Sequence, residues 1–217
     1  MNDKDFSIIF YTSNREDADF EQRIQRLLLK MSHNRFPIIS VSQKPIDFGD
    51  NICVGDVGVS DHNLYRQVLI ACEAAKTPFV ISAEADCLYT PGYFQLDDPL
   101  PNQVYRYNNV WVMKHHRSYF FYKRWSEGAQ IIGREYYIDL LKLALAGKPE
   151  WQVGHFPTNP FGRLHHQWIY YGTPDMPVIS IKTGKGLRAN VYLNAGFVKV
   201  LPYWGTTKVV REKLGLA

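Results

Sequence analysis

The sequence predicts an α/β fold. Between Phe6 and Phe94, short apolar runs alternate with segments whose apolar residues recur every three or four positions. Short apolar runs bounded by turn residues are typical of buried strands, and the longer period is typical of amphipathic helices. The 217 residues, 46% of them hydrophobic, are enough to bury one sizeable core. We therefore expect a single domain over residues 1–217.

The expected elements follow from these patterns. In the first half they are, in order, a strand at Phe6–Tyr11, a helix whose S-x-x-E capping box is Ser13 and Glu16, a strand at Pro37–Ser42, a helix capped by Ser60 or Asp61, and a strand at Phe79–Ser82. In the second half they are a hairpin within Val104–Met113 that turns at Asn108-Asn109, strands at Ser118–Tyr122, Ala129–Ile132 and Pro177–Lys182, and helices at Arg134–Ala146 and Thr206–Leu214.

The composition argues against a secreted or membrane protein. The amino terminus lacks the basic-then-apolar layout of a signal peptide, and no apolar run approaches the roughly 18 residues that a membrane span requires. The 3 cysteines show no C-x-x-C spacing, which fits reduced thiols. We expect a cytoplasmic protein without a transmembrane segment. The net charge of +4 is compatible with an anionic substrate or a nucleic acid and requires neither.

Two acids, Glu84 and Asp86, directly follow the third predicted strand. Open α/β sheets bind their ligands beyond the carboxyl ends of the strands. Two carboxylates close together at such an edge suit Mg²⁺ or Mn²⁺ carrying substrate phosphates. An acid-x-acid sequence also occurs by chance, and then it is usually a solvated turn or a helix cap.

Three further segments carry candidate ligands for an anion. The loop from Thr12 to Arg15 follows the first strand, and Arg66 lies near the start of the second helix, where free backbone N–H groups attract anions. The turn after the last predicted strand carries Lys185 and Arg188. Each segment also has a simpler interpretation, which is helix capping for the loop, a surface position for Arg66 and a solvated basic turn for the lysine and arginine.

The alternating first half, the acid-x-acid sequence and the later stretch SEGAQIIGREYYIDLL together resemble the GT-A glycosyltransferases of the family-two type. The resemblance extends from the amino terminus to the helix at Arg134–Ala146. The chain departs from the family pattern in its first acid, which is glutamate, and in lacking a later paired-acid motif. The resemblance implies a GT-A-like single domain with a Rossmann-like mixed sheet flanked by helices, a β-hairpin and an irregular C-terminal part. Residues 1–100 would bind a nucleotide sugar and residues 101–217 an acceptor.

The same resemblance implies roles for individual residues. Glu84 and Asp86 would hold Mn²⁺ or Mg²⁺ on the diphosphate of the nucleotide sugar. A histidine would complete the metal shell, with His165 as the first choice and His166 and His155 as alternatives. Residues expected to contact the nucleotide are Thr12, Ser13, Asn14, Arg15, Arg66, Lys185 and Arg188. A UDP-sugar is favoured as the donor, although no residue distinguishes UDP from GDP. The acceptor is a hydroxyl group, and the likeness to a phage branch of the family makes a hydroxymethylated base in DNA one candidate.

A hexosyltransferase of this kind is expected to invert the configuration at the anomeric carbon of the sugar. An inverting transfer requires a carboxylate base that takes the proton of the acceptor hydroxyl. Glu127 is the first choice because it lies in the loop beside the predicted acceptor strand. Glu150 and Asp175 are alternatives, since the irregular segment at residues 148–176 can fold over a site as a lid.

Two other functions remain open at this point. A nucleotidyltransferase shares the alternation of strands and helices and the metal-binding acids, although the loop TSNRED lacks the glycines of a phosphate-binding loop. A nucleic-acid-binding module would use basic residues with exposed tyrosine and tryptophan. Its binding would depend steeply on salt and would need neither a metal nor a sugar nucleotide.

Overall fold

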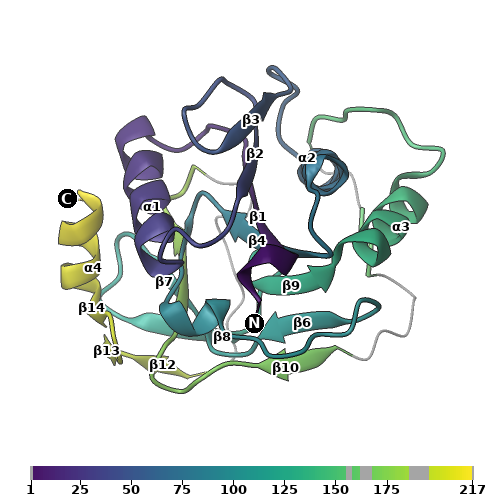
Figure 1. Ribbon diagram of the computed structural model, residues 1–217. Helices are drawn as coiled ribbons and strands as arrows, with labels where there is room; N and C mark the ends of the chain where they lie inside the picture. Colours follow the sequence, from purple (N-terminus) through teal and green to yellow (C-terminus); the bar gives the residue numbers. More distant parts are fainter. Residues whose placement is uncertain (1, 155–157, 162–167, 186–195, 217) are drawn as a thin grey trace.

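A seven-stranded mixed sheet lies at the centre of the computed structural model, which describes residues 2–154, 158–161, 168–185 and 196–216 (Figure 1). Its strand order is β10-β6-β9-β4-β1-β2-β3. The strands are β1 (Phe6–Thr12), β2 (Ile38–Ser42), β3 (Asp50–Cys53), β4 (Phe79–Glu84), β6 (Val104–Tyr107), β9 (Gln130–Gly133) and β10 (Ile169–Tyr171). The neighbours β4, β1, β2 and β3 run parallel, whereas β9 is antiparallel to both β4 and β6. The predicted α/β class with a mixed sheet is confirmed.

Helices cover both faces of this sheet. They are α1 (Ala18–Met31), α2 (Asp61–Ala74) and α3 (Arg134–Leu145). Since side chains alternate along a strand, Ile8 of β1 packs in the core beside α1, whereas Ile9 packs in the core beneath α2 and α3. Figure 1 shows α1 on one side of the sheet and α2 with α3 on the other. Within the described ranges, none of the helices is both long and apolar enough to cross a bilayer.

A second sheet packs on the α1 side, in the order β12-β8-β7-β11-β5. Its strands are β5 (Cys87–Leu88), β7 (Val110–Lys114), β8 (Phe120–Arg124), β11 (Val178–Lys182) and β12 (Phe197–Val198). The remaining elements are the ribbon of β13 (Val200–Leu201) and β14 (Gly205–Thr206), the helix α4 (Thr207–Leu214), and two 3₁₀ turns, η1 (Asp3–Asp5) and η2 (Pro91–Phe94). Val110 and Ile179 of this sheet share one core cluster with Phe10 of β1, so the two sheets enclose a common core.

Most of the predicted strands and helices form close to their expected bounds, but the predicted capping box is wrong. The helix α1 begins at Ala18, and its N-cap is Asp17, whose carboxylate accepts from the N–H groups of Asp19 and Phe20. Glu16 is left outside the helix, where it bonds to a distant loop.

The predicted hairpin within Val104–Met113 is also wrong. The two strands form, but β6 pairs with β9 and β10, whereas β7 pairs with β8 and β11. Asn108 and Asn109 therefore carry the chain from one sheet to the other. The chain bends at Asn108, but the strands on either side of the bend pair with distant strands and not with each other.

Candidate active site

The acids Glu84 and Asp86 lie where the two sheets meet. Glu84 is the last residue of β4, and the chain enters β5 of the second sheet at Cys87. The Ile181 N–H of β11 donates to the carbonyl of Asp86 at 2.7 Å, which holds the intervening turn in place. Because β4 runs parallel to β1, the acids lie at the carboxyl edge of the central sheet, as the sequence predicted.

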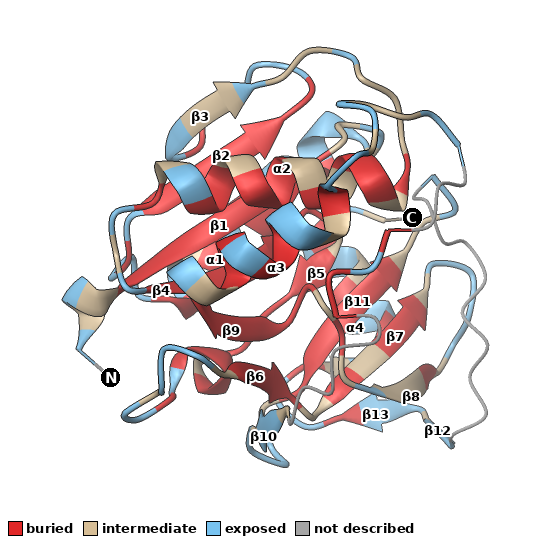
Figure 2. Ribbon diagram, turned by 90° about the vertical axis from the view of Figure 1, so that its right-hand side faces the viewer, coloured by how far each residue is buried: buried red, intermediate tan, exposed pale blue. Residues whose placement is uncertain are grey.

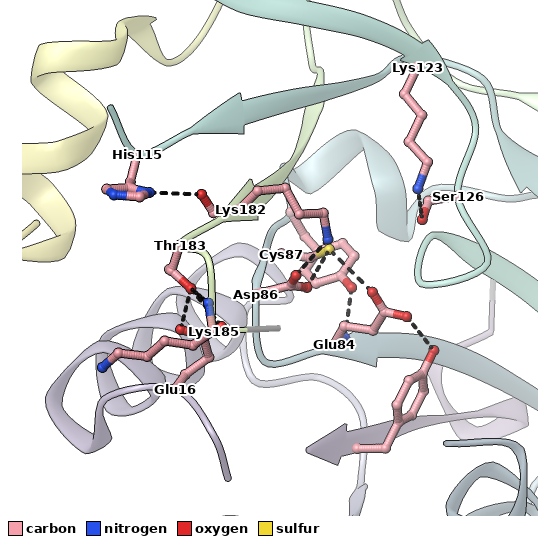
Figure 3. Close-up of polar contacts among 12 residues, drawn as sticks. Glu16, Glu84, Asp86, Cys87, His115, Lys123, Ser126, Lys182, Thr183 and Lys185 are labelled. Carbon is pink, nitrogen blue, oxygen red and sulfur yellow. Dashed lines mark hydrogen bonds and ion pairs between the residues drawn. The ribbon is translucent and has the colours of Figure 1, made fainter. Parts of the chain in front are cut away.

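A lysine is paired with one of these acids. Lys182 Nζ lies 2.8 Å from Asp86 Oδ2, and the two side chains are only 15% and 17% exposed. Burial lowers the pKa of Lys182, but the negative charges around it, above all Asp86, outweigh burial and hold the pKa above its ordinary value. Figure 3 shows the ammonium group pointing at Asp86. This corner of the molecule thus holds a positive charge of its own.

The carboxyl group of Glu84 completes a small negative cluster. Its Oε1 accepts a hydrogen bond from the Tyr11 hydroxyl at 3.3 Å, and Cys87 Sγ lies 3.8 Å from its Oε2. Burial, followed by the negative charge of Asp86, raises the pKa of Glu84. Both effects disfavour a second charge at this turn, and a cation between the two carboxylates would relieve both.

The residues of the turn fit a divalent metal ion. Glu84, Asp86 and Cys87 each offer one ligand atom, and these atoms lie within 4.8 Å of one another. Carboxylate oxygens are the ligands that Mg²⁺ and Mn²⁺ prefer, and a thiolate adds affinity for softer ions. Two carboxylates carry more charge than the single ammonium of Lys182 can neutralise. A metal ion would therefore complete the charge balance once Lys182 turns away from Asp86.

The loop before β9 closes the site beside Glu84. A Cβ at Gly128 would lie 2.5 Å from Glu84 Cδ, so glycine leaves the room that this carboxyl group occupies. The Tyr89 hydroxyl donates to the carbonyl of Gly128 at 2.6 Å and fixes the loop. The neighbouring Glu127 accepts a hydrogen bond from the hydroxyl of Tyr65 on α2, and its charge acts on the Glu84 carboxyl. The loop thus holds Glu127, the predicted base, where its charge reaches the Glu84 carboxyl group.

A cavity of about 970 Å³ opens at the carboxyl ends of β1 and β2. Its size is typical of sites for small organic ligands. The walls contain polar and charged side chains from the loops after β1 and β2 and from the start of α2, namely Ser13, Asn14, Arg15, Gln43, Lys44, Asp56 and Asp61. Three of the four residues predicted after the first strand therefore line it, and the fourth, Thr12, lies buried beneath them.

The wall of this cavity is held by two side chains. Asn14 Oδ1 accepts from the backbone N–H groups of Gln43 and Lys44, each at 2.8 Å, and so ties the β1 loop to the end of β2. Thr12 Oγ1 donates to the buried Glu21 Oε1 at 2.8 Å. Burial raises the pKa of Glu21 to about 7. The side chains of Thr12 and Asn14 therefore position the loop, and the loop in turn lines the cavity.

A latch joins the loop after β11 to the loop before α1. Thr183 Oγ1 lies 2.8 and 2.7 Å from the two carboxylate oxygens of Glu16. The Lys185 N–H donates to the same Oγ1 at 3.2 Å. Figure 3 shows the latch beside the Asp86 turn, with the exposed side chain of Lys185 pointing away from it. The predicted cation lies next to the site without contacting the acids.

The other predicted residues lie apart from the acid pair or outside the described residues. Arg66 donates to the carbonyls of Lys148 and Pro149 at 3.4 and 3.1 Å, so it anchors the chain that follows α3. Glu150 and Asp175 are exposed. The positions of His165 and Arg188 fall outside the part of the chain that the structure describes.

Sequence reasoning missed Lys182 and Tyr65 as members of the site. Lys182 ends the strand predicted at Pro177–Lys182, and a charged residue at a strand's carboxyl end is the same signal that pointed to Glu84 and Asp86. Tyr65 gave no such signal, because an aromatic residue on a helix is ordinarily a core residue.

No protein-family model matches the sequence, and neither does any curated protein. Solved structures do match. A glycosyltransferase involved in the glycosylation of the major capsid of PBCV-1 aligns with a TM-score of 0.50 at 11% identity, over 83% of this chain and 95% of that one. The chain has a GT-A-like fold. At this identity the likeness is one of fold, and the chemistry must be argued from the site.

Two further structures align less well. The mannosyltransferase PcManGT from Pyrobaculum calidifontis, in complex with GDP-Man and Mn²⁺, gives a TM-score of 0.49 at 14% identity, over 84% of this chain and 58% of that one. The bifunctional IspDF from Campylobacter jejuni gives 0.41 at 13% identity, over 71% and 50%. Neither match adds to the assignment of the fold.

Replacing Glu21 by glutamine is expected to flatten the pH dependence of stability. The pKa of this carboxyl is about 7 in the folded chain and near the ordinary 4.5 in the unfolded chain. Between these values the folded chain binds the extra proton. The free energy of unfolding therefore falls by up to roughly 3 kcal/mol as the pH rises through the interval.

Urea unfolding between about pH 5 and pH 8 measures this slope. Glu212→Gln, on the exposed side of α4, is the matched control and should keep the wild-type slope. If the free energy of unfolding of Glu21→Gln changes with pH as steeply as that of the wild type, the raised pKa of Glu21 is contradicted.

Replacing Gly128 by alanine is expected to weaken Mn²⁺ binding by about tenfold or more, because the added Cβ displaces the Glu84 carboxyl. Stability should change little, since the end of a side chain can move aside. Isothermal titration calorimetry with Mn²⁺ measures the effect. Gly196→Ala is the control, because a Cβ there meets nothing within 4 Å. Equal Mn²⁺ affinity in the Gly128→Ala variant and the wild type would count against a role for Glu84 in the cation site.

Proposed function

We propose that this protein is a metal-dependent glycosyltransferase that moves a sugar from a nucleoside-diphosphate sugar to a hydroxyl acceptor. One observation carries the proposal. In a sheet of GT-A-like order, Glu84 and Asp86 converge at the carboxyl end of β4, and the largely buried Lys182 is paired with Asp86. Such a cluster suits a diphosphate and its metal ion. The cavity of about 970 Å³ along the neighbouring strands offers room for the nucleoside.

Glu84 and Asp86 would hold Mn²⁺ or Mg²⁺, with Cys87 close enough to join them. When bound, the ion would supply positive charge against the diphosphate that departs in the reaction. The backbone of the Thr12–Arg15 loop would face the nucleoside, as the side chains of Thr12 and Asn14 are engaged in holding that loop. Arg66 has the least support among the proposed ligands, because its guanidinium donates to the carbonyls of Lys148 and Pro149 after α3.

Lys182 has a double role in this proposal. Without substrate it neutralises Asp86. A diphosphate offers the ammonium group more negative oxygens than a single carboxylate does, so substrate binding draws Lys182 from Asp86 to the leaving group. Lys185, held close by the latch between Thr183 and Glu16, adds positive charge at the rim of the site.

Glu127 is the proposed base of an inverting transfer. The acceptor oxygen attacks the anomeric carbon, the bond to the diphosphate breaks with its electron pair, and the Glu127 carboxylate takes the proton of the acceptor. Tyr65 donates a hydrogen bond to one oxygen of that carboxylate and so fixes its orientation. Glu150 and Asp175 are weaker candidates because both are solvent-exposed.

The proposal assigns residues 1–100 to the donor and residues 101–217 to the acceptor. A UDP-sugar is the first donor to test, and a hydroxymethylated base in DNA is one hydroxyl acceptor to include. His165 and Arg188 stay as proposed ligands of the metal and the diphosphate.

A thermal-shift screen of UDP, GDP and their sugars, with and without Mn²⁺, tests the proposed function. One nucleotide is expected to stabilise the protein in the presence of Mn²⁺. At a hundred times Kd the gain is about 2.7 kcal/mol, or roughly 5–10 °C in Tm for a chain of this size. Asp86→Ala should abolish the shift, whereas Asp139→Ala on the exposed side of α3 should keep it. If no nucleotide shifts the folded wild type, the proposed function fails.

A further inference from the structure

Arg106 of β6 carries a buried guanidinium group. Its side chain is 0% exposed, and Nε, Nη1 and Nη2 have no hydrogen-bond partner among the described residues. Three aromatic rings surround the guanidinium, at 4.2 Å for Trp125, 3.8 Å for Trp168 and 4.8 Å for Phe161. Cation–π contacts offset part of the cost of burying the charge, but they satisfy none of its N–H donors.

Among the residues that the structure describes, two more buried polar atoms without hydrogen-bond partners lie on the neighbouring strands. They are Gln130 Oε1 of β9, directly opposite Arg106, and Ser82 Oγ of β4. Figure 2 shows β6, β9 and β4 side by side. Native structures leave few buried polar atoms unpaired, so several on adjacent strands require an explanation such as water or a ligand.

Arg106, Gln130 and Ser82 form a row across β6, β9 and β4, and this row lies on the same face of the sheet as the acid Glu84. Side chains alternate along a strand, and the residues two positions away from each member of the row, Val80, Val104 and Ile132, all pack in the core beneath α2 and α3. Glu84 follows Ser82 at the same spacing. The row therefore leads from the acid pair to Arg106, and the charge of Glu127 acts on both ends of it.

The chemistry of the row selects an anion. The five N–H groups of Arg106 and the Nε1 of Trp168, which is also buried and unpartnered among the described residues, are all donors, and Gln130 Oε1 is a single acceptor beside them. A guanidinium edge matches the paired oxygens of a carboxylate or a phosphate. A neutral hydroxyl would add no negative charge to that of Glu127, which makes no hydrogen bond to the guanidinium.

We propose that Arg106, together with Trp168 Nε1, forms an anion-recognising subsite for a carboxylate or phosphate group of the acceptor. Trp125 and Trp168, which both contact the guanidinium, are only half-buried, so this side of the subsite reaches solvent. The description of this subsite as part of the acceptor site rests on the proposed function. The recognition of an anion rests on the contacts of Arg106 alone.

Titrations followed by tryptophan fluorescence test the subsite, because Trp125 and Trp168 contact the guanidinium. The probes are glucuronate, glucose 6-phosphate and uncharged glucose, added with saturating UDP and Mn²⁺ to keep the anions out of the donor site. The wild type should bind at least one charged sugar roughly thirtyfold more tightly than glucose. Preference for glucuronate indicates a carboxylate acceptor, and preference for glucose 6-phosphate indicates a phosphate.

Arg106→Met should reduce this preference to within about threefold while leaving the protein at least as stable, because an unpaired buried charge is removed. Arg35→Met is the matched control, since Arg35 also lies over a ring, that of Phe36 at 4.8 Å, but is paired with Asp3 at the surface. It should keep the wild-type preference.

If the wild type binds the three sugars equally, or binds none of them, the proposed subsite is wrong. Water molecules would then satisfy the unpaired atoms of Arg106, Gln130 and Ser82. The comparison of the three sugars uses the wild type alone, so it tests the subsite even if Arg106→Met fails to fold. The donor-site screen with UDP and Mn²⁺ is read separately by thermal shift. If the wild type shows no anion preference although it binds the nucleotide, that result therefore counts against the subsite alone.

Discussion

The ion pair between Lys182 and Asp86 is the interaction on which the arrangement of the site depends. It joins the turn after β4 to the end of β11, and so connects the central sheet to the second sheet at the point where the acids lie. Both side chains are largely buried, which makes an unpaired carboxylate or ammonium costly there. The same pairing keeps a positive charge beside Glu84 and Asp86. The ammonium group of Lys182 could therefore turn from Asp86 to an incoming diphosphate.

The two ends of the site are built in different ways. At the proposed donor end, the side chains of the loop are engaged in hydrogen bonds, as Asn14 joins the ends of β1 and β2 and Thr12 bonds to Glu21. At the proposed acceptor end, polar atoms near Arg106 are buried without partners among the described residues. The first arrangement would present a fixed surface to a nucleotide, whereas the unpaired N–H donors beside Trp125 and Trp168 would gain most from a charged ligand.

Sequence patterns predicted the strands and helices well, because the periods of buried residues are local signals. They predicted the position of Glu84 and Asp86 because both acids end an apolar run. They failed at Asn108-Asn109, where a turn between two strands looks the same whether those strands pair or enter different sheets. The pairing of Asp86 with Lys182 could not be predicted from the sequence either. Lys182 lies 96 residues further along the chain, and the pairing of β11 with β5 that brings it there leaves no local trace.

The most direct test is an electron paramagnetic resonance titration of Mn²⁺, with and without UDP, on the wild type and Lys182→Met. If Lys182 is the resident counter-ion, UDP should tighten Mn²⁺ binding to the wild type by about tenfold. Lys182→Met should bind Mn²⁺ more tightly without UDP, because the competing charge is gone, and UDP should then add little. Identical Mn²⁺ binding by both proteins, with and without UDP, would contradict a shared site for Lys182, the metal ion and the diphosphate.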